Sequence, residues 1–145
     1  LMLACDIVCS SEDAKFIQSF VNVGLVPDCG GMYLLKEKVG LQKAKELMFT
    51  ADVISAQEAE KLKMVMHVYT KEDLKIETEK IAQKIAQGAP MAIMYMKKML
   101  NKSYANLKDF LDEEALVQTF CLGTEDCKEG ILAFKQKRQP NFQGK

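Results

Sequence analysis

The sequence contains no tryptophan, a single histidine and only three prolines in 145 residues. Its 20 basic and 20 acidic residues cancel, so net charge gives no reason to expect binding to nucleic acid or to other acidic surfaces. No apolar run reaches the roughly 18 residues that a membrane-spanning helix needs. There is no Cys-x-x-Cys pair, and one histidine does not complete a zinc site with scattered cysteines. We therefore expect no nucleic-acid partner, no membrane span and no metal.

What is present is typical of a globular domain or a large piece of one: 48% hydrophobic and 28% charged residues. Its five cysteines predict reduced thiols packed in a core, in a reducing compartment. The sequence starts at Leu1, within an apolar stretch and without a charged leader, which is not typical of a signal peptide. We expect that the beginning of the protein is missing and that it is cytoplasmic. A mitochondrial or peroxisomal location stays open.

Strand patterns come early in the chain and helix patterns late. The β-branched, apolar run at residues 1–10 predicts a buried strand, and residues 15–23 a short extended or irregular piece. Helix signals follow from residue 32, with capping patterns that begin at Ser55, Thr70 and Thr124. The pattern predicts an α/β fold, with an α/β part over residues 1–70 and a helical part over residues 71–145.

Two of the expected helices are apolar on more than one face. Residues 91–100 are rich in methionine, and residues 110–122 carry apolar side chains around most of the circumference. A helix of this kind is buried on more than one side. Two interpretations remain open, a deep core within one chain or an interface between subunits.

The segment over residues 22–35 combines features that also suit a site. Pro27 forces the preceding residue into an extended conformation, Asp28 follows, and Gly30 and Gly31 come directly before an expected helix. A carboxylate there can accept hydrogen bonds from the free N–H groups of the helix. It can also act as a base at the edge of a pocket, where glycines allow a ligand to approach the backbone. The residues alone leave both roles open.

Taken in order, these pieces make the chain similar to the enoyl-CoA hydratase/isomerase, or crotonase, superfamily. The matching pieces are Leu3-Ala4-Cys5-Asp6-Ile7, Ser11-Glu12-Asp13-Ala14-Lys15-Phe16, Gly24-Leu25-Val26-Pro27-Asp28-Cys29-Gly30-Gly31, the segment from Gly40 to Leu47, Ile54-Ser55-Ala56-Gln57-Glu58-Ala59, and the end from Glu129 to Phe142. The resemblance implies a crotonase-like superhelix of β-β-α turns, incomplete here, followed by C-terminal helices that pack a homotrimer or a dimer of trimers. It also implies that the two oxyanion-hole amides of the family lie upstream of Leu1.

The resemblance further implies an enzyme acting on acyl-CoA thioesters, with no metal and no cofactor apart from the coenzyme A of the substrate. Phe20 stands where hydratases have their second catalytic glutamate, and a phenyl ring cannot transfer a proton. Asp28 stands where several members have a working aspartate. We therefore predict double-bond isomerisation of an enoyl-CoA with Asp28 as base. The alternatives are an enoyl-CoA hydratase, or a non-catalytic or truncated member that contributes only trimer packing and CoA binding. The chain alone is expected to be inactive.

The remaining site predictions follow from the same resemblance. The substrate pocket is expected to include Phe20, Val26, Pro27, Cys29 and Gly30. Phe134 and Lys137 are predicted to bind CoA, because an aromatic ring and a lysine can contact adenine and phosphate. The alternative for this basic stretch is a solvated face that complements the C-terminus of the last helix.

Overall fold

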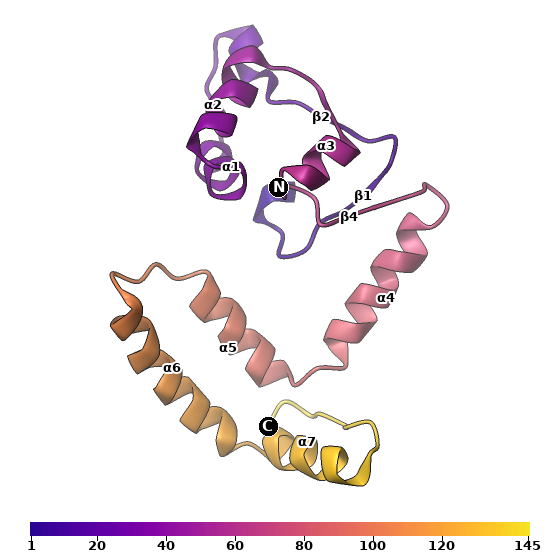
Figure 1. Ribbon diagram of the computed structural model, residues 1–145, viewed down its shortest axis with the longest axis vertical. Helices are drawn as coiled ribbons and strands as arrows, with labels where there is room; N and C mark the ends of the chain where they lie inside the picture. Colours follow the sequence, from indigo (N-terminus) through magenta and orange to yellow (C-terminus); the bar gives the residue numbers. More distant parts are fainter. The chain divides into compact units, whose positions relative to one another are not determined.

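The computed structural model describes residues 1–145, which form two compact units, residues 1–80 and residues 81–145. Helix α4 (Leu74–Ala86) runs across the boundary without a break (Figure 1). The division expected from the sequence, between residues 70 and 71, lies just before this helix. Thr70 begins the turn that leads into it, since its hydroxyl oxygen accepts the N–H of Asp73 at 3.1 Å.

The first unit contains two small sheets. Strand β1 (Cys9–Ser11) pairs in parallel with β4 (His67–Tyr69), and β2 (Lys15–Phe16) pairs antiparallel with β3 (Ile54–Ser55). The strand predicted over residues 1–10 is wrong for most of its length. Met2–Ala4 form a 3-10 helix, in which the N–H of Ala4 donates to the carbonyl of Leu1 at 2.9 Å. Local hydrogen bonds thus satisfy the backbone here, and strand pairing begins only at Cys9.

The helices of the first unit are α1 (Gly31–Val39), α2 (Leu41–Thr50) and α3 (Ala56–Lys61). Gly40 separates α1 from α2 with φ 78°, a left-handed value that favours glycine. The core is built from side chains of these helices and the segment after α3: Leu35, Ala44, Leu47, Ala59, Met64 and Val65. Ser55 caps α3 as predicted, because its hydroxyl oxygen accepts the N–H of Glu58 at 3.1 Å. The core is small for this unit, and it fixes α1 against α2.

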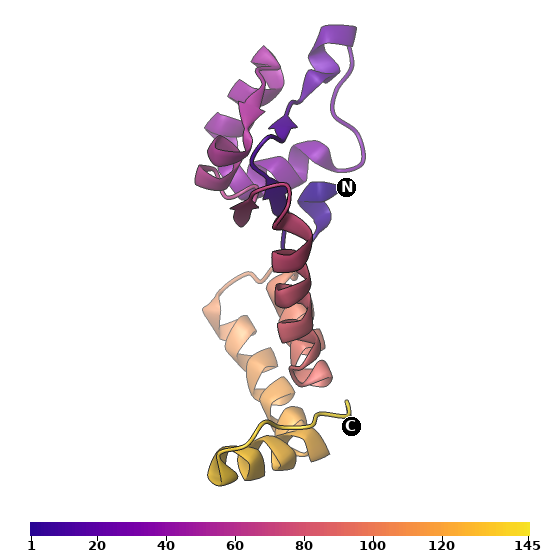
Figure 2. The same cartoon turned by 90° about the vertical axis from the view of Figure 1, so that its right-hand side faces the viewer.

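The second unit contains α5 (Pro90–Leu100), α6 (Leu107–Leu122) and α7 (Glu125–Gln136). Tyr95 of α5 meets Phe120 of α6 edge to face, with ring centroids 5.2 Å apart. Thr124 caps α7 as predicted, since its hydroxyl oxygen accepts the N–H of Cys127 at 3.1 Å. Residues 137–145, which we call the C-terminal strap, turn back along α7 in both views (Figures 1 and 2).

Helices α5 and α6 bury little of their apolar surface in this chain. Met99 is the buried residue of α5, and α6 has none. Large apolar side chains remain exposed on both: Met94, Met96, Leu100, Leu107, Leu111, Leu116, Phe120 and Leu122. The interpretation that a deep core within one chain covers both faces is therefore wrong for these residues. The interface interpretation is treated below as a proposal.

No helix in the structure combines the length and apolar character needed to cross a bilayer. The structure brings together no group of three or more His, Cys, Asp or Glu side chains that could hold a metal ion. All five cysteines are free thiols. Cys5 and Cys29 are exposed and the other three are half-buried. The prediction that most of the cysteines are core thiols is wrong, because none of the five is buried in the structure.

Candidate active site

Asp28 opens a tight turn that leads directly into α1. Its carbonyl accepts the N–H of Gly31 at 2.8 Å, and the two residues between them have positive φ angles, 49° at Cys29 and 75° at Gly30. Two successive left-handed residues are the hallmark of a type I′ turn. Glycine adopts this conformation freely, whereas cysteine does so at a cost of about 1–2 kcal/mol. The sequence therefore folds here into a defined but strained turn.

The Asp28 side chain does not cap the helix. The N-cap residue of α1 is Gly30, and no side chain accepts a hydrogen bond there. Asp28 lies two residues before the N-cap, so its backbone closes the turn while its carboxylate stays exposed without a hydrogen bond or ion pair. The capping role that the sequence left open is therefore wrong. The role of Asp28 as a base remains a prediction.

The other predicted pocket residues lie in the turn itself or in the segment just before it. Phe20 is half-buried in a 3-10 helix (Ser19–Val23), and its carbonyl accepts the N–H of Leu25 at 3.0 Å. Val26 is exposed, and Pro27 is half-buried. A Cβ at Gly31 would lie 3.4 Å from Cβ of Pro27, at van der Waals contact, so the extended segment packs directly against the start of α1. The structure thus leaves these residues exposed or half-buried and does not enclose them in a pocket.

The first unit also has an apolar hollow of about 400 Å³, away from the predicted pocket residues. It is lined by residues of the N-terminal 3-10 helix, β2, the segment after it, α2 and β3: Leu1, Met2, Leu3, Lys15, Phe16, Ile17, Gln18, Leu47, Asp52, Ile54 and Met64. Neither Asp28 nor Phe20 is among them. The predicted catalytic and pocket residues and this apolar hollow are therefore separate features.

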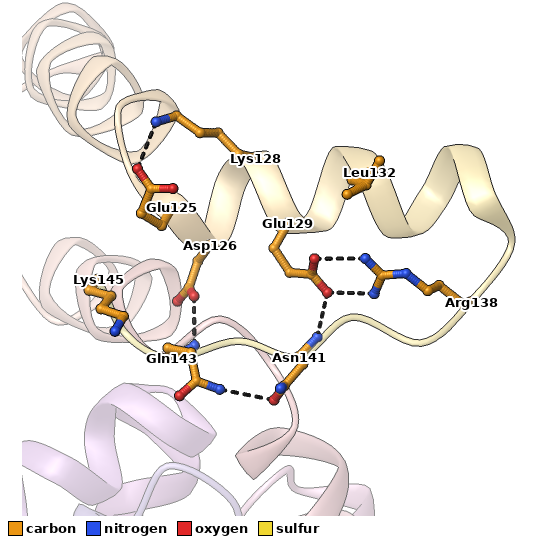
Figure 3. A pocket seen from close by; sticks show the side chains of 9 residues that line it. All are labelled: Glu125, Asp126, Lys128, Glu129, Leu132, Arg138, Asn141, Gln143 and Lys145. Atoms are coloured by element: carbon orange, nitrogen blue, oxygen red, sulfur yellow. Dashed lines mark hydrogen bonds and ion pairs between the residues drawn. The ribbon is translucent and has the colours of Figure 1, made fainter.

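In the second unit, two carboxylates on one face of α7 hold the C-terminal strap (Figure 3). Asp126, only 4% exposed, accepts the N–H of Gln143 at 2.7 Å and the N–H of Gly144 at 2.8 Å. Its own N–H donates to the carbonyl of Lys145 at 3.1 Å. A buried carboxylate needs such partners, and backbone amides supply them here. The end of the strap is thereby fixed to the first turn of α7.

Glu129 holds the start of the strap in the same way. Its two carboxylate oxygens accept hydrogen bonds from Nη1 and Nη2 of Arg138 at 2.6 and 2.8 Å, and the N–H of Asn141 donates at 2.8 Å (Figure 3). The Arg138 guanidinium, followed by the Asn141 N–H, lowers the pKa of Glu129 from 4.5 to about 2. A side chain at Gly130 would lie 3.4 Å from the Phe142 ring, so the missing side chain leaves room for the strap.

The predicted CoA-binding residues stand beside this arrangement. Phe134, in the last turn of α7, is 86% exposed. Lys137 is exposed and follows the helix in the left-handed conformation, with φ 54°. Both residues thus lie, exposed, at the C-terminal end of α7. Nothing in the chain itself covers either side chain, and their role stays a prediction.

Comparison with known proteins identifies the class of the chain. Its fold is crotonase-like: an enoyl-CoA hydratase from Bacillus anthracis matches 99% of the chain with a TM-score of 0.94 and 33% identity. The family model for enoyl-CoA hydratase/isomerase matches residues 1–145, and the chain belongs to this family. The expected family and its incomplete α/β fold are confirmed.

The relatives carry both activities in their names. The chain is 34% identical, over its whole length, to the trans-2-decenoyl-[acyl-carrier-protein] isomerase of Streptococcus mutans, and spans 56% of that protein. It is 40% identical to a short-chain-enoyl-CoA hydratase of Clostridioides difficile, over 93% of the chain and 88% of that protein. It also spans 56% of the Bacillus anthracis structure. The chain thus covers about half the length of most of these relatives.

The anchoring carboxylates of α7 were missed by sequence reasoning. Asp126 and Glu129 are three residues apart, which places them on one face of a helix that Thr124 caps. That spacing alone is typical of a solvated helix face. What distinguishes these two carboxylates is that the strap turns back onto them. That turn relies on the backbone N–H groups of residues 141, 143 and 144, and backbone groups leave no pattern in the sequence.

Proposed function

We propose that the protein carrying this chain isomerises the double bond of an enoyl thioester of coenzyme A, with Asp28 as the base. The observation that carries this proposal is the free Asp28 carboxylate on a turn that its own backbone closes. A base needs a carboxylate that no structural partner occupies. Asp28 meets that requirement, since it makes neither a cap hydrogen bond nor an ion pair.

Phe20 supports isomerisation over hydration. Addition of water in this family uses two glutamates, and the position of the second is held by the apolar ring of Phe20. A single carboxylate is enough to move a proton between two carbons. Asp28 would remove a proton from C2 of a 3-enoyl thioester and return it to C4, so that the double bond moves from C3–C4 to C2–C3. No atom is gained or lost in this step.

The enolate formed midway needs stabilisation that residues 1–145 do not supply. We assign it to backbone N–H donors in the sequence upstream, each worth about 3–4 kcal/mol in the transition state. We propose that upstream sequence also covers Asp28, which is exposed in residues 1–145. This agrees with the length of the relatives, since the chain spans 56% of the Streptococcus mutans protein. The chain by itself is therefore expected to be inactive.

For substrate binding, we assign Phe134 and Lys137 to coenzyme A, with the phenyl ring against adenine and the ammonium group on a phosphate. Coenzyme A enters as part of the substrate, and the proposed proton transfer asks for no other cofactor. The exposed apolar faces of α5 and α6 are assigned to contacts between copies, in a homotrimer or a dimer of trimers. Adaptable methionines such as Met94 and Met96 suit such an interface.

The test compares wild type with Asp28→Asn in the protein expressed from its complete reading frame. The substrates are a 3-enoyl-CoA, scored for bond migration, and crotonyl-CoA, scored for water addition. Removal of the base is expected to lower kcat for bond migration by about 10²–10⁴-fold with little change in KM. Asp52→Asn is the matched control, because Asp52 is equally exposed and lies outside the turn. Unchanged turnover in a folded Asp28→Asn variant would contradict the proposal.

The rival is an enoyl-CoA hydratase, favoured by the 40% identity to the Clostridioides difficile hydratase. The same experiment separates the two. Water addition to crotonyl-CoA at a rate above bond migration would reject the isomerase and support the hydratase. Absence of both activities, with CoA still bound, would support a non-catalytic member of the family.

A further inference from the structure

Helix α7 ends in a motif in which a lysine occupies the position usually held by glycine. The N–H of Arg138 donates to the carbonyl of Ala133 at 3.1 Å, and the N–H of Lys137 donates to the carbonyl of Phe134 at 3.2 Å. This pair of bonds defines a Schellman motif, whose left-handed residue is here Lys137, with φ 54°. A side chain at this position strains the backbone, and such strain persists only where surrounding contacts over-determine it.

The contacts that hold this turn come from Glu129. Arg138, the residue directly after Lys137, is bound at both Nη atoms by the Glu129 carboxylate. Its Nε donates to the Gln136 side chain at 2.7 Å, so the guanidinium is fixed from both sides of Lys137. The Asn141 N–H adds a further bond to the same Glu129 oxygen that Nη1 contacts. The residue that follows the strained one is thus the most firmly anchored side chain of the strap.

We infer that Glu129 and Arg138 are positioning residues, which lock Lys137 in the left-handed conformation and so fix the direction in which its side chain leaves the end of α7, three residues after the exposed Phe134. This inference rests on the proposed binding of coenzyme A by Phe134 and Lys137. It goes beyond that proposal by assigning a task to two side chains that touch each other and not the ligand. The same arrangement explains why the strap is fixed at its start by an ion pair and at its end by Asp126, which bonds only to backbone groups.

A purely structural role predicts a different choice of residue. If the turn served only to end the helix, glycine at position 137 would be free of strain and would fit the motif better than lysine. Ala51 ends α2 in the same left-handed conformation, so the conformation alone assigns no task; what distinguishes Lys137 is the ion pair that holds the residue after it. The bidentate geometry of the Arg138–Glu129 pair supplies an orientation as well as an attraction, which a lysine–glutamate pair would not.

The test measures the Kd of coenzyme A, as the probe, by calorimetry on the full-length protein. The variants are Lys137→Gly, Glu129→Gln and the double variant. The control is Glu125→Gln, which breaks the exposed pair of Glu125 with Lys128, 2.7 Å apart on the same helix. Lys137→Gly is expected to weaken binding roughly fivefold to tenfold, the size of one charge-assisted contact, without lowering the midpoint of thermal unfolding.

Glu129→Gln is expected to weaken binding by a similar factor, and the double variant no more than Lys137→Gly alone. That non-additivity is the signature of residues that act through one another, and loss of structure alone would not produce it. Glu125→Gln should leave the Kd unchanged. If Glu129→Gln does not fold, Arg138→Lys takes its place in the same cycle, since it keeps the charge and loses the bidentate contact.

Multiplying effects in the double variant, or an unchanged Kd in Glu129→Gln, would overturn the positioning role while leaving CoA binding by Lys137 in place. A wild-type protein that does not bind coenzyme A would overturn the proposed function, and this inference with it. A drop in the unfolding midpoint of Lys137→Gly would also count against the inference, because it would show that lysine is there for stability.

Discussion

Replacement of Gly30 by alanine tests the turn that presents Asp28. Gly30 has φ 75°, and a built Cβ there has as its nearest neighbour Cδ1 of Leu34, at 3.9 Å. The added methyl group would therefore be in ordinary van der Waals contact with Leu34 and would not clash. The whole effect is the backbone strain of a second L-residue in the left-handed region, about 1–2 kcal/mol. Glycine's greater freedom in the unfolded chain opposes this by about 0.4–1 kcal/mol. The net expectation is a loss of up to about 1.6 kcal/mol, with a midpoint of about 0.8 kcal/mol.

The neighbouring glycine provides a control of opposite sign. Gly31 is the first residue of α1 and does not have a positive φ, so Gly31→Ala makes the same chemical change without left-handed strain. It is expected to be neutral or to stabilise by up to about 1 kcal/mol. Urea unfolding followed by circular dichroism measures both, and a 1 kcal/mol difference shifts the midpoint by roughly 0.3–1 M. Equal effects of the two substitutions would refute the turn geometry. If Gly30→Ala also lowers kcat more than KM, the turn positions Asp28 as proposed.

Three further predictions concern other parts of the chain. Glu129 has a pKa of about 2 in the folded protein against 4.5 ordinarily, so its contribution to stability is present above pH 4.5 and is lost as the pH falls toward 2. Unfolding by urea at pH 5 and pH 2.5 should therefore show a smaller loss on acidification in Glu129→Gln than in wild type, and an identical loss would contradict the pair. Ser55→Ala removes the cap of α3 and should lower the free energy of unfolding by about 1 kcal/mol, whereas an unaffected variant would mean that the cap hydrogen bond contributes nothing in solution. If copies associate through α6, Leu116→Lys, at a side chain 73% exposed in the single chain, should reduce the mass seen by light scattering, and a trimer that persists in this variant would place the interface elsewhere.

The sequence predicted the helices well because their signals are local. Glycine at position 40, serine at 55, proline at 90 and threonine at 124 each act on the backbone within one turn of themselves, and the helices begin or end where these residues stand. The strands were predicted less well, since pairing partners lie far away in sequence. Cys9 pairs with His67, and residues 2–4, which pair with no strand, form a 3-10 helix instead of the strand that their composition favours.

For the candidate site, the sequence by itself determined the family, through an ordered set of short motifs. From the family follow the predictions for Asp28, Phe20, Phe134 and Lys137. Only the tertiary structure decided how exposed these side chains are and which groups they contact. Helix α1 begins at Gly31 with Gly30 as its N-cap, two residues after Asp28, and this leaves the Asp28 carboxylate free. The anchoring of the strap by Asp126 and Glu129 depends on backbone N–H groups brought back from residues 141–144. Nearly every residue carries the same backbone N–H group. The sequence therefore shows the carboxylates that can accept a hydrogen bond, and only the fold shows which N–H group reaches each of them.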